Sequence, residues 1–216
     1  MQADKFIFVN DLYSKKLNIS KSFIVCYGDY IQKKLKKNEQ VNFEINLVYA
    51  GLITQDMYPD VYLAIDAMLH LDSHFNLKII GYGENDSIEK LKKYIYDKKL
   101  SDRVKYDGLF VGEEYTHYLS KCDIGLNPRV LEDTISDYTF PSKVMTYLSH
   151  GLSVVSTTIN CIKYSRISSE ISFSIDKSPE SFADAIKALK SRGNIKVNLD
   201  ELNNDFRNEL RGLVEK

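Results

Sequence analysis

The 216-residue sequence lacks several features that define specialised classes of protein. It has no run of about 18 apolar residues, so we expect no transmembrane segment. Its start, MQADKFIFVNDLYSKK, does not follow the basic-then-apolar order of a signal peptide. The 29 basic and 30 acidic residues give a net charge of -1, without the positive excess of a dedicated nucleic-acid-binding protein. We therefore expect a cytoplasmic protein with no nucleic-acid partner.

Residues that bind metals or form disulfides are also scarce. The three cysteines, Cys26, Cys122 and Cys161, are widely separated and odd in number, which argues against a disulfide framework. We interpret them as buried thiols. The histidines form no H-E-x-x-H pattern, and the chain has no P-loop and no G-x-S-x-G motif. We expect neither a metal site nor a resident cofactor.

What the sequence does contain is an ordinary globular composition, with 44% hydrophobic and 27% charged residues. From residue 44 onward, short β-branched or aromatic runs alternate with helical patterns, which is typical of βαβ units. The expected strands lie at 45–51, 77–83, 103–110, 122–128 and 152–157. Helices are expected from about 59 to 71 and at about 86–99, 113–121, 141–150, 178–191 and 199–214. The pattern predicts an α/β fold with a Rossmann-like parallel sheet flanked by helices.

The first forty residues differ from the rest. They hold two short strand-like runs, KFIFVND and SFIVCYG, separated by a polar stretch and followed by the charged segment IQKKLKKNEQ. This is too little for a domain of its own.

The most informative stretch is DYTFPSKVMTYLSHGLSVVST, residues 137–157. Pro141 suits the first position of a helix and Gly151 the position just beyond its end. Lys143 then lies in the first turn, where the helix dipole makes a cation unfavourable by up to about 1 kcal/mol unless an anion binds there. The backbone amides of Ser142 and Lys143, with both side chains, would form a diphosphate cradle. The alternative is an ordinary helix start with a solvated lysine.

Three glycines follow other strands at the edge where open parallel sheets bind ligands. Gly51 lies in the turn AGLITQDMYPD, and Gly81 and Gly83 lie in GYGEND. The second stretch is not the dinucleotide fingerprint, because Asp86 stands where the third glycine is needed. They are either cleft residues or plain turn glycines.

The order of these motifs resembles the nucleotide-sugar-binding C-terminal half of GT-B-fold glycosyltransferases of the group 1 kind, which act in bacterial surface-polysaccharide synthesis. The resemblance runs from about residue 42 to 158. It rests on LVYAGLI, LKIIGYGEND, SDRVKYDGLF, CDIGLNPR and TFPSKVMTYLSHGLSVVST.

The resemblance implies a set of donor-binding residues, namely Gly51, Gly81, Gly83, Gly108, Leu109, Phe110, Tyr138, Thr139, Phe140, Ser142, Lys143 and Thr146. Gly51 would lie near the diphosphate and the backbone at 108–110 near the base, while the loop at 137–140 would face the donor sugar. Arg129 and Lys143 are the implied catalytic residues, because they would neutralise the leaving diphosphate without a metal.

The sequence departs from the family at four positions. Many members carry two glutamates separated by seven residues, where Tyr138 and Thr146 stand here. A threonine offers one hydroxyl in place of a carboxylate that binds both ribose hydroxyls. Leu52 and Met57 occupy positions that are often basic.

We therefore expect the donor-binding half of a retaining glycosyltransferase that uses a nucleotide-sugar. Residues 1–41 would be a connection or remnant of an N-terminal domain, 42–192 the Rossmann-like domain and 193–216 a C-terminal helix. The acceptor-binding N-terminal domain or a partner chain would be missing, and any peripheral membrane association would come through it. Two alternatives remain open, namely a non-catalytic module that docks a partner chain and an unrelated small-ligand domain of the flavodoxin-like or another Rossmann type.

Overall fold

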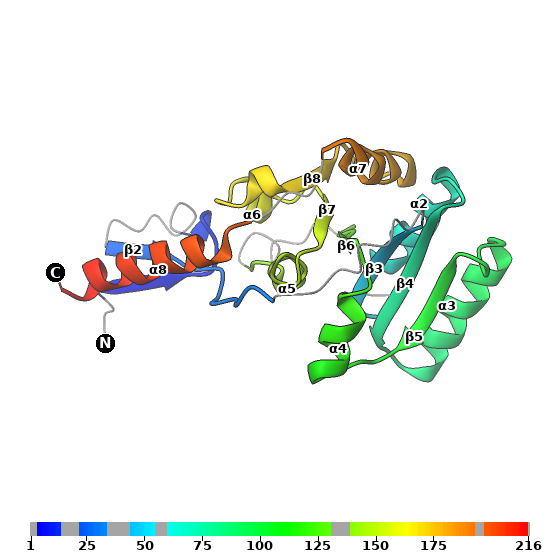
Figure 1. Cartoon of the computed structure of the whole chain (residues 1–216), viewed down its shortest axis with the longest axis horizontal. Coiled ribbons are helices and arrows are strands. Elements are labelled where there is room, and N and C mark those ends of the chain that lie inside the picture. The colour runs from blue at the N-terminus through cyan, green and yellow to red at the C-terminus, as the bar shows by residue number, and fades with distance from the viewer. Residues whose placement is uncertain are drawn as a thin grey trace.

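The computed structural model describes residues 4–13, 22–33, 44–54, 60–130, 139–192 and 197–215. Its strands form a six-stranded sheet and a separate two-stranded sheet. The molecule is elongated, with the small sheet and the last helix at one end, where both termini lie, and the large sheet at the other (Figure 1).

The large sheet is parallel throughout and has the strand order β5-β4-β3-β6-β7-β8. Its strands are β3 (Ile45–Leu52), β4 (Phe75–Tyr82), β5 (Val104–Gly108), β6 (Ile124–Asn127), β7 (Ser153–Thr157) and β8 (Ile171–Ser174). The order reverses between β3 and β6, as in dinucleotide-binding folds, whereas a flavodoxin-like sheet runs in another order. The predicted Rossmann-like class is confirmed, and the flavodoxin-like alternative is wrong.

The described helices are α2 (Asp60–Ala67), η1 (Met68–His70), α3 (Asn85–Asp97), α4 (Gly112–Leu119), α5 (Ser142–Ser149), α6 (Asn160–Lys163), η3 (Ser168–Glu170), α7 (Pro179–Arg192) and α8 (Leu199–Val214). Sequence periodicity missed α6 and η3, which are about one turn each, and the short strand β8. Helix α5 begins one residue later than predicted. Pro141 is its N-cap, with φ -66° and an extended ψ of 105°.

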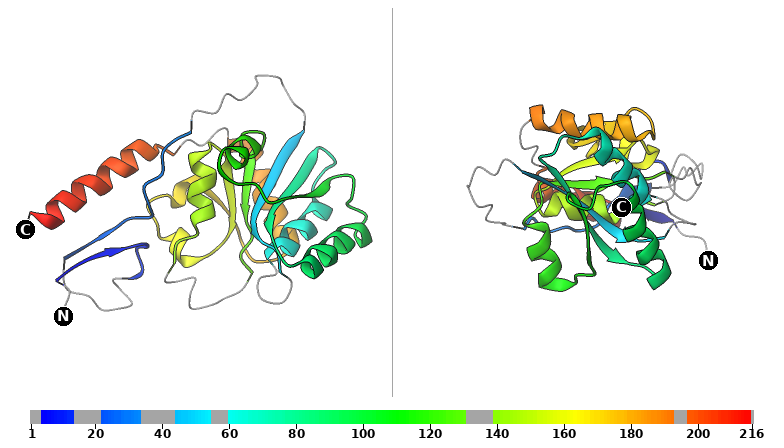
Figure 2. Two further views of the ribbon diagram at one scale, coloured as in Figure 1. Left: turned by 90° about the horizontal axis from the view of Figure 1, so that it is seen from below. Right: turned by 90° about the vertical axis from the view of Figure 1, so that its right-hand side faces the viewer.

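Both faces of the large sheet are covered, as a parallel sheet requires. Side chains alternate along β3. Leu47 and Tyr49 join one buried cluster with residues of α2 and α7, whereas Val48 and Ala50 join a second with residues of α5. The two further views show the helices on either side of the strands (Figure 2).

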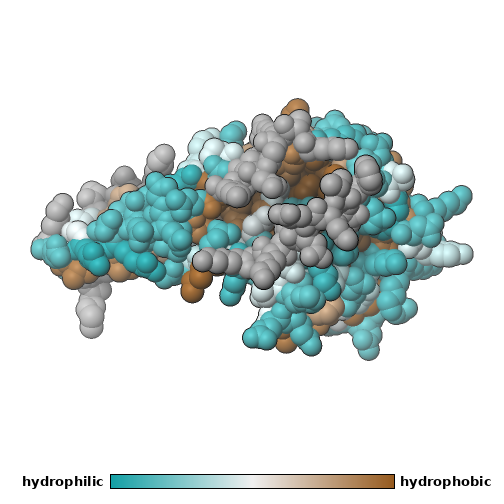
Figure 3. All heavy atoms as spheres, in the orientation of Figure 1, coloured by the Kyte–Doolittle hydropathy of each residue, from teal (hydrophilic) through white to brown (hydrophobic). Residues whose placement is uncertain are grey.

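The small sheet pairs β1 (Lys5–Phe8) with β2 (Ser22–Val25) in parallel, so the two strand-like runs near the start of the chain are joined. Helix α8 packs against β2. The Asn203 amide nitrogen donates to the Tyr30 carbonyl oxygen at 3.0 Å, and Arg207 pairs with Asp29 at 3.2 Å. The surface of α8 that faces the viewer in Figure 3 is hydrophilic, as expected of an amphipathic helix with one buried face.

The cysteines differ in burial. Cys122 and Cys161 are buried, but Cys26 is only half-buried, because it follows β2 at the rim of the small sheet. Within the described residues, none of the helices has the length and apolar character needed to span a membrane.

Candidate functional site

The site begins where the strand order reverses. Strands β3 and β6 pair only at Leu47↔Ile124 and Val48↔Gly125, near the middle of β3. Beyond these pairs the two strands separate toward their carboxyl ends. A crevice at this point of an open α/β sheet is the usual place for a ligand.

Helix α5 is held at this crevice by its own Tyr147. A Cβ atom on Gly125 would lie 2.3 Å from the Tyr147 ring, so only glycine lets the ring rest on β6. The Tyr147 hydroxyl accepts a hydrogen bond of 2.8 Å from the backbone N–H of Ala50 on β3. The buried ring therefore bridges both strands and aims the N-terminus of α5 at the crevice.

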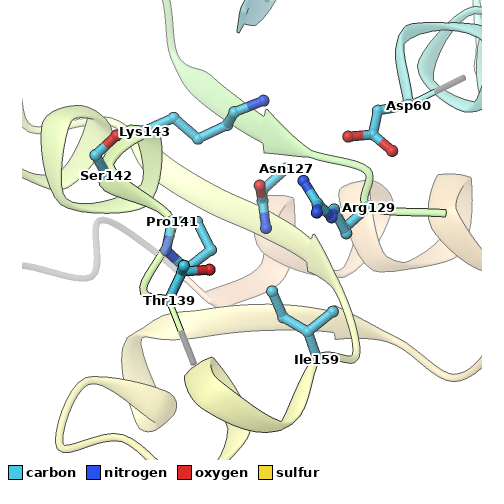
Figure 4. A pocket seen from close by; sticks show the side chains of 8 residues that line it. All are labelled: Asp60, Asn127, Arg129, Thr139, Pro141, Ser142, Lys143 and Ile159. Carbon is cyan, nitrogen blue, oxygen red and sulfur yellow. The ribbon is translucent and has the colours of Figure 1, made fainter. Parts of the chain in front are cut away.

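A pocket of about 140 Å³ opens beside this helix end, and its lining side chains converge on it (Figure 4). They come from the start of α2, the end of β6, the loop before α5, the start of α5 and the segment after β7. The lining residues are Asp60, Asn127, Arg129, Thr139, Pro141, Ser142, Lys143 and Ile159.

Lys143 crosses the crevice toward β3. Its ammonium nitrogen lies 4.5 Å from the centre of the Tyr49 ring, within cation–π distance, and 3.2 Å from the place where a Cβ atom on Gly51 would stand. Burial of the ammonium lowers the Lys143 pKa to about 8, and Arg129 acts in the same direction, while Asp60 opposes them. Two cations, Lys143 and Arg129, thus line a pocket with one carboxylate, Asp60, and this excess of positive charge is suited to receive an anion.

Asp60 is the acidic member of the pocket. The residue is buried, and one carboxylate oxygen accepts a hydrogen bond of 3.0 Å from the backbone N–H of Val130. This bond ties the start of α2 to the segment that carries Arg129. The Arg129 carbonyl oxygen in turn accepts from the Thr157 hydroxyl at 2.7 Å. The backbone at Arg129 is thus fixed by β7, and the Arg129 side chain lines the same pocket as the carboxylate of Asp60 (Figure 4).

The structure brings together part of the set that the sequence singled out. Arg129, Thr139, Ser142 and Lys143 line the pocket, and Gly51 lies against the Lys143 ammonium.

Thr146 does not line the pocket, because its hydroxyl donates to the Ser142 carbonyl oxygen at 3.0 Å within the helix. Phe140 is not among the lining residues, and its ring stacks on Tyr27. Tyr138 and Met57 lie outside the described residues.

Gly81 near the end of β4 and Gly83 just after it stand where the neighbouring backbone leaves no room for a side chain. Gly81 has φ +137°, and a Cβ atom there would lie 1.8 Å from the Gly51 carbonyl oxygen. A Cβ atom on Gly83 would lie 2.4 Å from the Ile53 carbonyl oxygen. The close approach of the β3 and β4 ends is therefore enough to explain why glycine stands at positions 81 and 83.

The segment 108–110 ends β5 at the same edge of the sheet. Gly108 has φ +88° and open space around its α-carbon, and Leu109 is exposed. The Phe110 ring packs on Tyr118 at 4.6 Å between centroids. None of the three lines the pocket.

Four lining residues lie outside the set predicted from the sequence, namely Asp60, Asn127, Pro141 and Ile159. Asn127 had the clearest signal, since it is a polar residue at the carboxyl end of a buried strand. Its amide donates to the Ser156 hydroxyl at 2.8 Å, which holds it at the floor between β6 and β7. In the part of the chain that the structure describes, no three His, Cys, Asp or Glu side chains gather in a way that would hold a metal ion.

The strand order, the crevice and the cationic helix start are features of the donor-binding half of a GT-B glycosyltransferase. The chain belongs to the family described as glycosyl transferases group 1, whose model matches residues 23–192. The match starts earlier than the resemblance seen in the sequence, and includes β2 except for its first residue. A search of curated proteins gave no match.

Solved structures share the fold at low sequence identity. The apo form of the lipopolysaccharide outer core galactosyltransferase WaaB has a TM-score of 0.69 and 16% identity, over 90% of this chain and 55% of that one. Anabaena HepE in complex with UDP has a TM-score of 0.65 and 13% identity, over 98% and 64%. The C-terminal domain of LpcC from Francisella tularensis has a TM-score of 0.56 and 14% identity, over 76% and 86%. The chain thus spans little more than half of WaaB.

Proposed function

We propose that this chain is the donor-binding part of a retaining glycosyltransferase that moves a sugar from a nucleoside diphosphate to a hydroxyl of a surface glycan. The observation that carries the proposal is the pocket at the N-terminus of α5, where Lys143 and Arg129 converge. Its position at the strand reversal supports it. HepE, which shares the fold, has been solved with UDP, and WaaB is by name a galactosyltransferase of lipopolysaccharide.

The chemistry of the pocket would be electrostatic. As the bond between sugar and diphosphate breaks, negative charge grows on the leaving diphosphate. The Lys143 ammonium, the Arg129 guanidinium and the first backbone amides of α5 would stabilise that charge. With a pKa of about 8, Lys143 is mostly protonated at pH 7, so no proton has to be supplied before the donor binds. No metal or other cofactor takes part in this scheme.

The remaining donor contacts are proposed on position alone. Gly51, Gly81 and Gly83 would border the diphosphate and the cleft, and the backbone at 108–110 would meet the base. Tyr138, Thr139 and Phe140 would belong to the sugar-facing loop. Thr146 would stand where other members hold the ribose.

The acceptor-binding part would come from polypeptide outside this sequence, either on a longer chain or on a partner. The small sheet supports this, since isolated two-stranded sheets are marginal in water and parallel ones are normally covered on both faces. In this scheme 1–41 is a remnant of the acceptor domain, 42–192 the donor domain and 193–216 a helix returning to the remnant. Any peripheral membrane attachment would come through that acceptor-binding polypeptide. The three free thiols favour the cytoplasm.

The direct test is calorimetric titration of the chain with UDP, GDP and their sugars. Binding of one nucleotide family below millimolar concentration is expected, with the sugar nucleotide binding at the same stoichiometry. The proposal fails if none of these ligands binds at millimolar concentration.

A second candidate is a non-catalytic module that docks a partner chain. Two observations favour it. The Thr146 hydroxyl donates its hydrogen bond within its own helix, and the carboxylate of Asp60 lines the pocket in which an anionic diphosphate would have to bind. Co-purification of a partner without nucleotide binding would support it. Loss of nucleotide binding in Lys143→Ala would argue against it.

A further inference from the structure

The small sheet reaches the donor loop through one aromatic side chain. Tyr27, two residues beyond β2, is buried and stacks on Phe140 with 4.4 Å between ring centroids and 22° between ring planes. Phe140 immediately precedes Pro141, the N-cap of α5, and Ser142, the first residue of the helix. The stack therefore lies two residues from the start of the helix that carries Lys143.

Tyr27 is itself fixed from two sides. Its hydroxyl donates to a carboxylate oxygen of Asp11 at 2.5 Å and accepts from the backbone N–H of Arg166 at 2.9 Å. Burial and the bond to Asp11 raise the pKa of Tyr27 well above its usual range, so the phenol keeps the proton that it donates. Arg166 pairs with Glu209 of α8 at 2.7 Å. The ring is thus tied to the segment after β1, to the loop after α6 and, through Arg166, to α8.

A second contact points the same way. The side chain of Asn10, which is fully buried just after β1, donates to the Thr139 carbonyl oxygen at 3.5 Å. Its own carbonyl oxygen accepts from the backbone N–H of Leu12 at 2.9 Å, which orients the amide. Thr139 and Phe140, the described residues of the loop before Pro141, therefore both touch the small-sheet end of the molecule.

We propose that Tyr27 is a positioning residue that holds the segment Thr139–Phe140, and with it the first turn of α5, in the geometry that binds the donor. For its effect on ligand binding this inference rests on the proposed function. It extends that function by making donor affinity depend on a residue of the small sheet, which is the part that an acceptor domain would complete. Movement of that domain would then reach the diphosphate pocket through the Tyr27–Phe140 stack.

The positioning is tested first without ligand, by amide hydrogen exchange. The Val144 amide donates to the Pro141 carbonyl oxygen at 3.0 Å, so its exchange reports whether the loop and the first turn stay joined. Tyr27→Leu removes the stack and is expected to speed this exchange by about three- to tenfold, the range that corresponds to one aromatic pair. Tyr27→Phe keeps the ring and loses only its hydrogen bonds, so it should restore most of the protection. Tyr96→Leu, at an exposed tyrosine of α3, is the matched control and should change nothing at Val144.

The partner residue supplies a double-mutant cycle. Phe140→Leu should speed Val144 exchange to the same degree as Tyr27→Leu, and the double variant should be no faster than either. Additive effects, or exchange at Val144 that Tyr27→Leu leaves unchanged, would overturn the positioning role.

A separate arm measures UDP affinity in the same variants. Tyr27→Leu is expected to weaken UDP binding by the factor seen in exchange, and Tyr27→Phe to restore it. If the wild-type chain and all variants bind UDP with equal affinity, the link to donor binding is wrong. If UDP does not bind the wild-type chain at all, the proposed function has failed, while the exchange result still decides whether Tyr27 positions the loop.

Discussion

The two sheets of this molecule are built from similar apolar strands, but their side chains are buried to different degrees. In the large sheet, β3 alternates its side chains between two buried clusters, and helices cover both faces. In the small sheet, Ile7 of β1 and Phe23 of β2 stay 55% and 40% exposed although the strands read FIF and FIV. Strand sequence alone therefore does not determine burial. The covering elements do, and for the small sheet α8 is the helix that the described structure shows packed against it.

The comparison also separates stability from function. In the large sheet, glycines at the ligand edge let β3 and β4 approach closely. The small sheet is held by polar contacts from α8 and by Phe8 and Val25, which pack into the same buried cluster as α5. The site lies between these two parts of the molecule, since α2, β6 and α5 supply residues to the pocket while Tyr27 stacks on Phe140 of the loop before α5. Changes to each part should accordingly give distinguishable effects.

The largest effect is expected from Gly81→Ala. Its φ of +137° and the 1.8 Å approach of an added Cβ atom to the Gly51 carbonyl oxygen would force β3 and β4 apart. Strain and overpacking together should lower the free energy of unfolding by at least about 3 kcal/mol, measured by urea denaturation. Gly108→Ala is the control, because its φ of +88° is also positive but nothing lies within 4 Å of the added atom. Equal losses in the two variants would contradict the account of the large sheet.

The second effect concerns the buried cation and its pH dependence. Lys143 has a pKa of about 8 in the folded chain against an ordinary 10.5, so between these values the unfolded chain binds more protons than the folded one. Stability from this group is therefore lowest below pH 8 and rises toward pH 10.5. Lys143→Met should stabilise the chain at pH 7 by up to about 3 kcal/mol.

The measurement is the difference in unfolding free energy between wild type and Lys143→Met from pH 7 to 10. Taking the difference cancels the contributions of the other titratable groups, which the two proteins share. The advantage of the variant should shrink as the pH rises through 8. A constant advantage would mean that the Lys143 ammonium is not penalised by burial.

The smallest effect is expected in the small sheet. Asn203→Ala removes the hydrogen bond from α8 to the Tyr30 carbonyl oxygen. It should lower the free energy of local opening of the small sheet by about 1 kcal/mol. Amide exchange along β1 and β2 is expected to speed up, while the midpoint of global unfolding hardly changes. Equal acceleration in β3 and β4 would show that the two sheets unfold as one unit.

The sequence allowed prediction of the large sheet because β-branched runs and helical periods are local signals. Strand β8 escaped because its four residues, ISFS, carry two serines. Asp60 could not be placed in the pocket from sequence, since it gets there through a contact with Val130, seventy residues away in the chain. The Tyr27–Phe140 stack is non-local in the same sense. Lys143, by contrast, was identifiable because a cation in the first turn of a helix is locally unfavourable and so indicates a ligand.

The most direct test of the central claim is a calorimetric titration of UDP into the wild-type chain and into Lys143→Met at pH 7. Lys93→Met, at an exposed lysine of α3, serves as the control for loss of one positive charge. Loss of a charge-assisted contact to the diphosphate should weaken binding by about ten- to a hundredfold in Lys143→Met and leave the control unchanged. Equal affinity of the wild type and Lys143→Met would contradict the claim that this pocket binds the diphosphate.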